Sequence, residues 1–255
     1  MPSAGLGAGP GEPCMGAVSG PLRRPPAGPT ALTPRRRARP PGVGRVGKRQ
    51  NGRMYVPSHF AMSEPALHSL LNRMGAADLI TMTQDGLVAT HLPLVYDDAS
   101  HSLLGHVART NDQWRRTPAG EALAIVHGPG GYITPTWYAT KKEHGRTVPT
   151  WNYVTAHVYG DLIVHDEAEW VEALVRRLTD KHEKDREHPW GVDDAPAAYI
   201  AGQLRAIVGV QLRITRIEAK SKLSQNRSAA DVDGVIAGLT ADGHDEHARA
   251  VAEVR

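Results

Sequence analysis

The sequence predicts an α+β domain that is mainly β, organised as a small closed or half-open barrel with appended helices. Three observations favour this class. β-prone runs fill the first half of the chain after residue 54, and helical periodicity is concentrated late. Strands and helices do not alternate as they would in a doubly wound sheet, so a barrel fits the order of elements better.

The early elements follow from spacing and from turn residues. A helix is expected over 63–74, where Ser63 can cap it and Pro65 suits its first turn. Asp85-Gly86 lies between two β-prone runs and predicts a hairpin. The strands expected here are 79–83, 87–96, 103–108 and 122–127, the last stopped by Gly128-Pro129-Gly130-Gly131 and followed by an edge or irregular segment at 132–138.

The later elements are one long β-prone run and several helices. Residues 150–165 fit one bent strand or two paired ones, with Gly160 near the break. Beyond 241 the chain turns polar and is expected to fray. Helices are expected over 167–181, 196–207 and 229–239, and a half-buried strand over 208–214.

Charge is divided unevenly along the 255 residues. Residues 1–53 hold ten Lys and Arg, one acid, eleven Gly and ten Pro, whereas 54–255 hold 20 basic and 26 acidic residues. The first segment cannot bury enough apolar area to fold, so we predict a disordered basic extension. One interpretation is that translation begins at Met54 and that residues 1–53 come from a start codon assigned too far upstream, which the abrupt change in composition favours. The other is that this basic segment binds nucleic acid or anionic lipid.

Composition also excludes several classes. An acidic body argues against a broad phosphate-binding face, so direct DNA contact is not expected of the body. The one cysteine, Cys14, lies in the extension and leaves the body no disulfide or thiolate site, and no metal is predicted. No run of about 18 apolar residues exists, so we expect a cytoplasmic protein without a membrane partner. The predicted organisation is an extension at 1–53, a domain at 54–240 and a polar tail at 241–255.

Polar residues gather where the strand expected over 103–108 ends. Arg109 offers a bidentate fork, Thr110 and Asn111 offer polar side chains, and the turn offers backbone donors, so these groups could converge on one anion. Trp114 could wall a flat ring nearby. The alternative interpretation is that Asn111 caps a helical turn, Trp114 packs in the core and Arg109 is a solvated rim residue.

A second cluster lies at 132–153, where five aromatic residues are interleaved with Lys and Arg. This mixture suits stacking on a heteroaromatic ring beside a phosphate, and it also suits a dimer interface. A third polar cluster, at 220–227, follows a strand and could project over the mouth of a barrel.

Eight strings, in order along the chain, are similar to those of the PaiB family of FMN-binding negative transcriptional regulators. The resemblance covers about 54–240 and includes the equivalent of Met54 as the first residue of the family pattern. The strings are MYVPSHF at 54–60, ATHLP at 89–93, GHVAR at 105–109, TPTWY at 134–138, KKEHG at 141–145, VPTWNY at 148–153, LTD at 178–180 and KLSQNR at 222–227.

The resemblance implies a split β-barrel of the pyridoxamine-phosphate-oxidase-like type, with FMN at the interface of a homodimer. It places Thr90, His91 and Leu92 along the flavin. It implies that the ribityl phosphate is held by His106, Ala108, Arg109, Thr110 and Asn111. Trp151 and Asn152 would contact the flavin from the next strand or from the partner subunit, and the candidates at the remaining motifs are Lys141, Lys142 and His144, with Trp114 beside the anion turn.

Three functions are compatible with these motifs. The family resemblance favours a negative transcriptional regulator that acts through flavin or metabolite sensing. The alternative is an FMN-dependent oxidoreductase that uses NAD(P)H or a small-molecule substrate, although no catalytic residue can be named from spacing. Haem binding is a third hypothesis, in which the iron ligand would be His59, His91 or His106.

Overall fold

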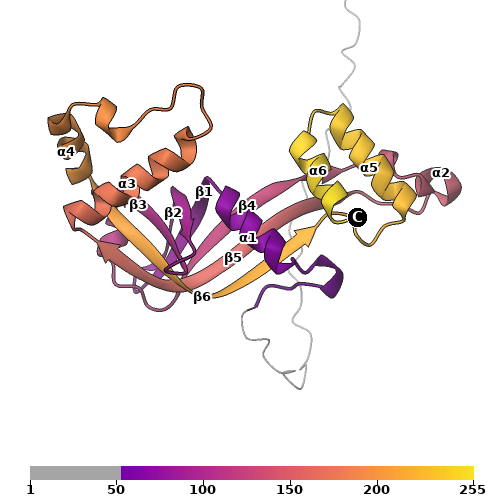
Figure 1. Cartoon of the computed structure of the whole chain (residues 1–255). Helices are drawn as coiled ribbons and strands as arrows, with labels where there is room; N and C mark the ends of the chain where they lie inside the picture. The colour runs from indigo at the N-terminus through magenta and orange to yellow at the C-terminus, as the bar shows by residue number, and fades with distance from the viewer. Residues whose placement is uncertain (1–52) are drawn as a thin grey trace, which may run out of the picture. The chain divides into compact units, whose positions relative to one another are not determined.

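Six antiparallel strands form a closed barrel in the order β1-β2-β3-β6-β5-β4 (Figure 1). The structure is a computed structural model that describes residues 53–255, and the predictions made for residues 1–52 lie outside it. The predicted fold class, mainly β with appended helices, is confirmed. The strands are β1 (Ala76–Thr83), β2 (Gly86–Asp97), β3 (Ser102–Ala108), β4 (Ala122–Ile133), β5 (Thr150–His165) and β6 (Ile207–Lys222).

Helices pack against the barrel and against the parts of its strands that run beyond it. The Ser63 hydroxyl accepts a hydrogen bond from the backbone N–H of Ala66, which gives α1 the cap predicted from the sequence. No helix within residues 53–255 has both the length and the apolar character needed to cross a bilayer. The α-helices are α1 (Glu64–Arg73), α2 (Thr140–His144), α3 (Ala168–Glu183), α4 (Ala197–Arg205), α5 (Ala229–Ala241) and α6 (Asp245–Glu253).

The predicted end of β4 at its glycine-proline run is wrong. The strand continues from Ala122 to Ile133, and its register against β5 shifts between His127 and Gly130. The irregularity is absorbed as a bulge because the neighbouring strand supplies pairing on both sides of it. β5 is one unbroken strand whose register against β6 shifts at Gly160, which agrees with the bent-strand interpretation.

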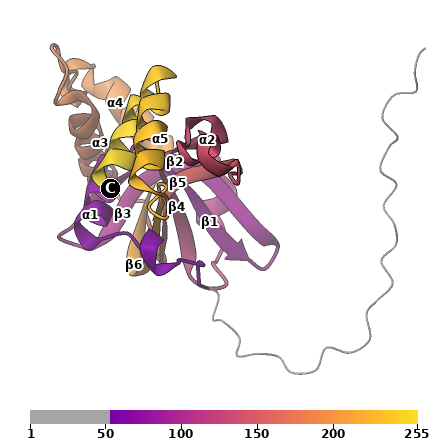
Figure 2. The same cartoon turned by 90° about the vertical axis from the view of Figure 1, so that its right-hand side faces the viewer.

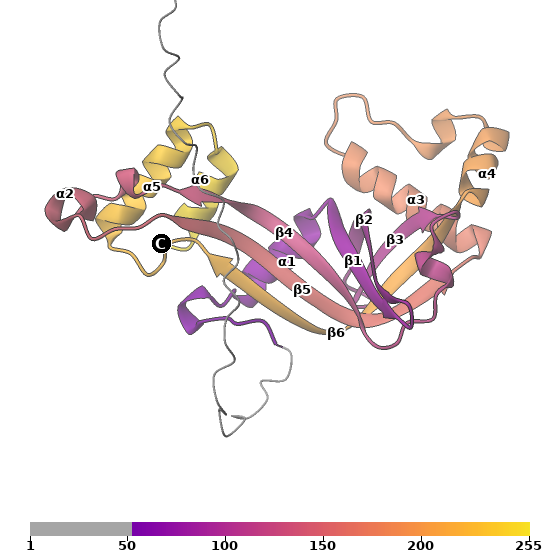
Figure 3. The same cartoon turned by 180° about the vertical axis from the view of Figure 1, so that it is seen from behind.

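The far parts of β4, β5 and β6 run beyond the barrel and form what we call the arm, residues 130–153 and 220–255. Figure 3 shows these strands leading from the barrel to α2, α5 and α6. Glycines allow close packing there, because a Cβ at Gly234 or Gly238 of α5 would overlap Trp137. The indole of Trp137 therefore lies directly against α5.

The predicted fraying beyond residue 241 is also wrong, because 245–253 form α6. Its inner face buries Ala248 and Val251 in the main core, and His247 is buried beside them. The polar residues of this segment lie on the opposite face, so the hydrophobic stripe is short and narrow. Figure 2 shows α5 and α6 as an adjacent pair.

The opposite end of the barrel is covered by α3. Leu174 and Leu178 pack on Val95 of β2 and form a second small core. The Trp170 ring stacks on His165 at a centroid distance of 4.0 Å. The helices α3 and α4 therefore lie at the end of β6 that is remote from the arm (Figure 1).

Residues from Met54 onward are part of the folded body. The backbone N–H of Met54 donates to a Glu218 carboxylate oxygen at 2.7 Å. The Lys220 ammonium, which is buried, lies 5.4–5.8 Å from the ring centroids of Tyr55, Phe60 and Tyr153. Cation–π attraction at a desolvated site stabilises this segment against β6.

Candidate functional site

The guanidinium of Arg109 is already held by its own chain. Its Nη1 and Nη2 donate to the two carboxylate oxygens of Asp166 at 3.0 and 2.5 Å. Its Nε donates to the Arg205 carbonyl at 2.7 Å, and Nη2 also donates to the Ile207 carbonyl at 3.1 Å. The guanidinium therefore makes the bidentate contact predicted for an anion. Its orientation is fixed by the hydrogen bonds to backbone carbonyls at the end of α4 and the start of β6.

Asp166 occupies this fork as a bidentate anion would. The Asp166 side chain is 50% exposed, so the pair lies at the surface and is screened by solvent. The hydrogen bonds from Arg109 lower the pKa of the Asp166 carboxyl. Guanidinium forks match carboxylate and phosphate alike, so the donor set fits a phosphate that displaces this exposed carboxylate.

The residues that follow Arg109 are used to build the turn. The Asn111 Oδ1 accepts a hydrogen bond from the Gln113 N–H, and its Nδ2 donates to the Thr90 hydroxyl, both at 2.9 Å. The indole N–H of Trp114 donates to the Arg109 carbonyl, and the ring packs against the main core. Asn111 therefore caps the turn, and Trp114 is half-buried against the core.

Gln113 is a positioning residue that sequence reasoning missed. Its side chain is buried, and its amide donates to the Leu79 carbonyl and the Thr81 hydroxyl at 3.1 Å each. These bonds attach the turn to β1 and so place Arg109 relative to the barrel. The sequence gives no local signal for this role, because the side-chain partners of Gln113 lie 25 to 34 positions away.

The ATHLP motif is divided between the two faces of β2. The His91 Nδ1 and the His127 Nε2 lie 2.8 and 2.9 Å from the two carboxylate oxygens of Asp78 on the outer face. These hydrogen bonds, the one from His127 first, lower the pKa of Asp78. Leu92 points inward and is 2% exposed, so it is a core residue and cannot reach a ligand on the outer surface.

His106 lies on β3 with a ring nitrogen that lacks a partner. Its Nδ1 is buried and makes no hydrogen bond within residues 53–255. Burial lowers the pKa of His106, so the neutral imidazole is favoured. The adjacent candidates Ala108 and Thr110 are exposed at the end of the strand.

The remaining candidates lie on the arm. Lys141 and Lys142 are exposed on α2, and Trp151 at the start of β5 is 58% exposed. Asn152 is fully buried, and its Nδ2 donates to the Ser224 hydroxyl at 3.0 Å. Asn152 therefore joins β5 to the chain after β6, and it is Trp151 that is accessible to a ligand.

One chain does not bring the two groups together. Ala108 pairs with Ile207 at one end of β6, and Tyr153 pairs with Lys222 at the other. Fifteen residues of strand separate these positions, which corresponds to about 50 Å of strand length at 3.3 Å per residue. The Arg109 turn and Trp151 therefore belong to opposite ends of the molecule.

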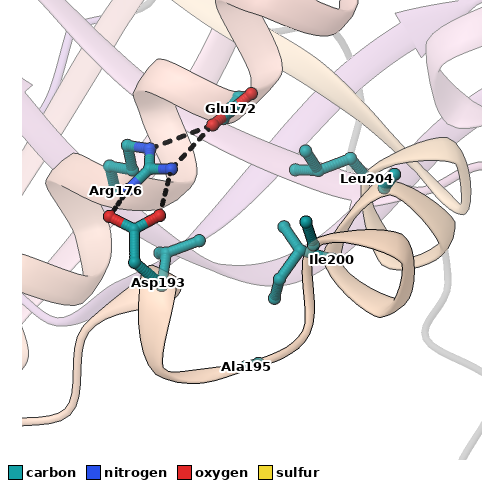
Figure 4. Close-up of a pocket in the computed structure, with 9 residues that line it drawn as sticks. Glu172, Arg176, Asp193, Ala195, Ile200 and Leu204 are labelled. Atoms are coloured by element: carbon teal, nitrogen blue, oxygen red, sulfur yellow. Dashed lines mark hydrogen bonds and ion pairs between the residues drawn. The ribbon is translucent and has the colours of Figure 1, made fainter.

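A cavity of about 280 Å³ between α3 and α4 contains none of the predicted residues (Figure 4). Arg176 forms one wall, bound to Asp193 and Glu172, while Ile200 and Leu204 face it from α4. Both carboxylates already neutralise the guanidinium. With two carboxylates around one guanidinium the group has a net negative charge, so the cavity presents no free positive charge to an anionic ligand.

One buried and two half-buried histidines make the stability of the protein depend on pH. Burial lowers the pKa of His106, His157 and His247 below the ordinary value of 6.5. Below about pH 6.5 the unfolded chain binds protons that the folded chain does not. The free energy of unfolding therefore decreases as the pH is lowered. We expect urea denaturation to give a lower free energy at about pH 5.5 than at about pH 7.5.

The histidine dependence has a matched control. Substitution of His106 by Gln is expected to reduce this pH slope, whereas substitution of the exposed His188 by Gln should leave it unchanged. The lowered pKa values of Asp78 and Asp166 act only in more acidic solution, below their ordinary value of 3.8. A free energy of unfolding that is the same at about pH 5.5 and at about pH 7.5 would contradict the burial of the His106, His157 and His247 imidazoles.

Comparison with known proteins agrees with the motifs. A family model described as "Putative FMN-binding domain" matches residues 54–216. The chain is 34% identical over 190 residues, 73% of this chain and 89% of the relative, to protease synthase and sporulation protein PAI 2 of Bacillus subtilis. It is 31% identical over 192 residues, 62% of this chain and 76% of the relative, to an uncharacterized protein of Emericella nidulans.

Among solved structures, a conserved hypothetical protein of Mycobacterium tuberculosis aligns with a TM-score of 0.48 at 11% identity, over 69% of this chain and 94% of that chain. An FAD and heme binding protein of Mycobacterium smegmatis aligns with a TM-score of 0.44 at 16% identity, over 69% of this chain and 78% of that chain. The resemblance to the PaiB family is confirmed by the family model and the Bacillus relative. The chain therefore belongs to the FMN-binding domain family, whose cofactor is FMN.

Proposed function

We propose that two copies of this chain share each FMN, with the phosphate on Arg109 of one copy and the ring system beside Trp151 of the other. The observation that carries this is the separation of the two groups along β6, by about 50 Å of strand. A flavin is far shorter than that. A second copy, placed so that its arm meets the first copy's barrel, supplies both groups at one site.

The outer face of the barrel supports a two-chain arrangement. Met82 and Leu87 are directly paired across β1 and β2 and are 54% and 70% exposed. His91 and Asp78 lie on the same outer face, because alternate residues of a strand share a side. These two exposed apolar side chains are the part of this face that a second copy would cover.

At the site, the chain's own residues bind and orient the cofactor. Arg109 would exchange Asp166 for the phosphate, while Nε stays on the Arg205 carbonyl and keeps the fork aimed. His91 and Trp151 are the accessible polar and aromatic groups for the ring system. FMN supplies the electron and hydride chemistry when it is bound, and the protein supplies its position.

We further propose that the protein is a negative transcriptional regulator that acts by sensing flavin state or a metabolite. The region from 54 to 255 has 20 basic and 26 acidic residues, so a broad phosphate-binding surface for DNA is not its main feature. Regulation would then pass through the flavin site rather than through direct DNA contact.

The test is a spectrum and a stoichiometry on the full chain. We expect the purified protein to show oxidised-flavin absorption that is lost on denaturation, and the released compound to be FMN. Light scattering should give a dimer, and a gel shift at moderate salt should give no sequence-specific DNA complex. A protein that stays colourless after incubation with FMN and runs as a monomer would contradict the shared site.

An anaerobic titration separates the regulator from the oxidoreductase. Addition of NADH or NADPH to the FMN complex is expected to leave the flavin oxidised if the protein senses rather than catalyses. Stoichiometric bleaching of the flavin by either nucleotide would instead favour the oxidoreductase.

A further inference from the structure

The geometry points to a second small-molecule site, between β4 of the arm and the α5–α6 turn, for a planar nitrogen heteroaromatic compound that carries an exocyclic amine. A cavity of about 360 Å³ lies there, within the range of small-ligand pockets. It is lined by Gly130, Gly131, Tyr132, Thr134, Trp137, Leu239, Asp242, His244 and His247.

His247 is the buried polar group of this cavity. Its side chain belongs to α6 and is only 5% exposed, and its Nε2 is buried without a hydrogen-bond partner within residues 53–255. Because Nε2 has almost no accessible surface, a ligand in the cavity would meet the imidazole at its Nδ1–Cε1 edge, which lies next to Gly131. Burial, with His244 nearby, lowers the pKa of His247, so the ring is neutral and can accept a hydrogen bond.

Gly131 leaves space in front of this imidazole. A Cβ on Gly131 would lie 3.5 Å from the His247 Nδ1 and 3.7 Å from its Cε1, which is ordinary contact without overlap. Because the glycine has no side chain, that volume remains open next to the ring. An alanine would fit and would fill it.

Two aromatic residues favour a flat ligand. The indole of Trp137 lies against Gly238 of α5, which fixes its plane, and it also lines the cavity. Tyr132 lines the same cavity from β4 and is 54% exposed. Aromatic side chains held in this way stack on planar rings.

The charge of the site favours an amine over an anion. Asp242, an exposed acidic residue, is among the residues that line the cavity. A neighbouring hollow of about 290 Å³ shares Gly130, His244 and His247 and adds Asp245 and Glu246. A carboxylate accepts hydrogen bonds from an exocyclic N–H and repels a phosphate, so this site differs in chemistry from the Arg109 fork. The cavity lies in the arm, away from the Arg109 fork, and it borders the position proposed for the flavin ring, since Tyr132 pairs directly with Trp151.

The experiment is a fluorescence titration of the full chain, in its native oligomeric state and saturated with FMN, with 2-aminopurine as the probe. We expect saturable quenching as the purine stacks on Trp137. Substitution of Gly131 by Ala should weaken binding by roughly tenfold or more, since a tenfold change needs only about 1.4 kcal/mol. Gly120→Ala is the matched control, because a Cβ there meets nothing within 4 Å.

A second pair of variants tests the charge. Asp242→Asn is expected to weaken binding of the amine, and Asp185→Asn, at another exposed position, should not. This pair keeps the test valid should Gly131→Ala lower stability, which thermal unfolding would report. The inference is overturned if no saturable quenching occurs, if Gly131→Ala and Asp242→Asn both bind like the unmodified chain, or if excess FMN displaces the purine from this cavity.

Discussion

Substitution of Arg109 by Leu is expected to weaken FMN binding by roughly 10- to 100-fold. The phosphate would lose a bidentate, charge-assisted donor, which belongs to the stronger class of hydrogen bonds in proteins. Titration of FMN fluorescence against protein concentration measures the change. Arg115→Leu is the matched control, because Arg115 lies in the same turn and is exposed above Trp114.

Substitution of Asp166 is expected to change the affinity for FMN in the opposite direction. Asp166→Asn removes the anion that competes for the Arg109 fork, so FMN should bind more tightly, by up to about fivefold, since surface ion pairs are weak. Weaker FMN binding in Asp166→Asn would indicate that Asp166 orients Arg109 rather than competes with the phosphate for it.

For the Arg109 prediction, equal FMN binding by Arg109→Leu and Arg115→Leu would contradict a phosphate at this turn.

Substitution of Gly160 by Ala is expected to lower the free energy of unfolding by about 3 kcal/mol or more, since the overlap is with backbone. A Cβ at Gly160 would overlap the carbonyl oxygen of Arg213 on β6. Gly160 lies where the β5–β6 register shifts, so the strands would have to separate there. Thermal unfolding should show a midpoint lower by about 10 °C, using 2–4 °C per kcal/mol for a domain of this size.

The effect of Gly160→Ala should propagate to the arm, because β5 and β6 continue into it. Gly120→Ala has the same chemical change in open space and should leave the midpoint unchanged within about 0.5 kcal/mol. An unaltered midpoint for Gly160→Ala would mean that the β5–β6 register shift lies elsewhere.

Local signals in the sequence were sufficient for many elements. Ser63 caps α1, and the hairpin predicted at Asp85-Gly86 joins β1 to β2 through a turn at Gln84 and Asp85. Each of these depends on residues within one turn of chain. The glycine-proline run in β4 and the polar surface of α6 misled the prediction, because strand pairing and packing on the core outweighed local propensity there.

The candidate site was predictable only in part, because its geometry depends on distant partners. The anion fork at Arg109 follows from the motif, yet Asp166 lies 57 positions away and could not be paired with it from sequence. Alternation along β2 turns Leu92 inward while His91 faces out. The gap between Arg109 and Trp151 became visible only once the β6 register was known.

The central claim is that one FMN site needs two chains, and mixed dimers test it most directly. Arg109→Leu and Trp151→Ala chains with different tags are co-expressed, and the heterodimer is purified on both tags. Each homodimer should fail to bind FMN tightly, whereas the heterodimer should bind one FMN with the affinity of the unmodified protein, since one of its sites keeps both groups. A heterodimer that binds no better than either homodimer would contradict the shared site.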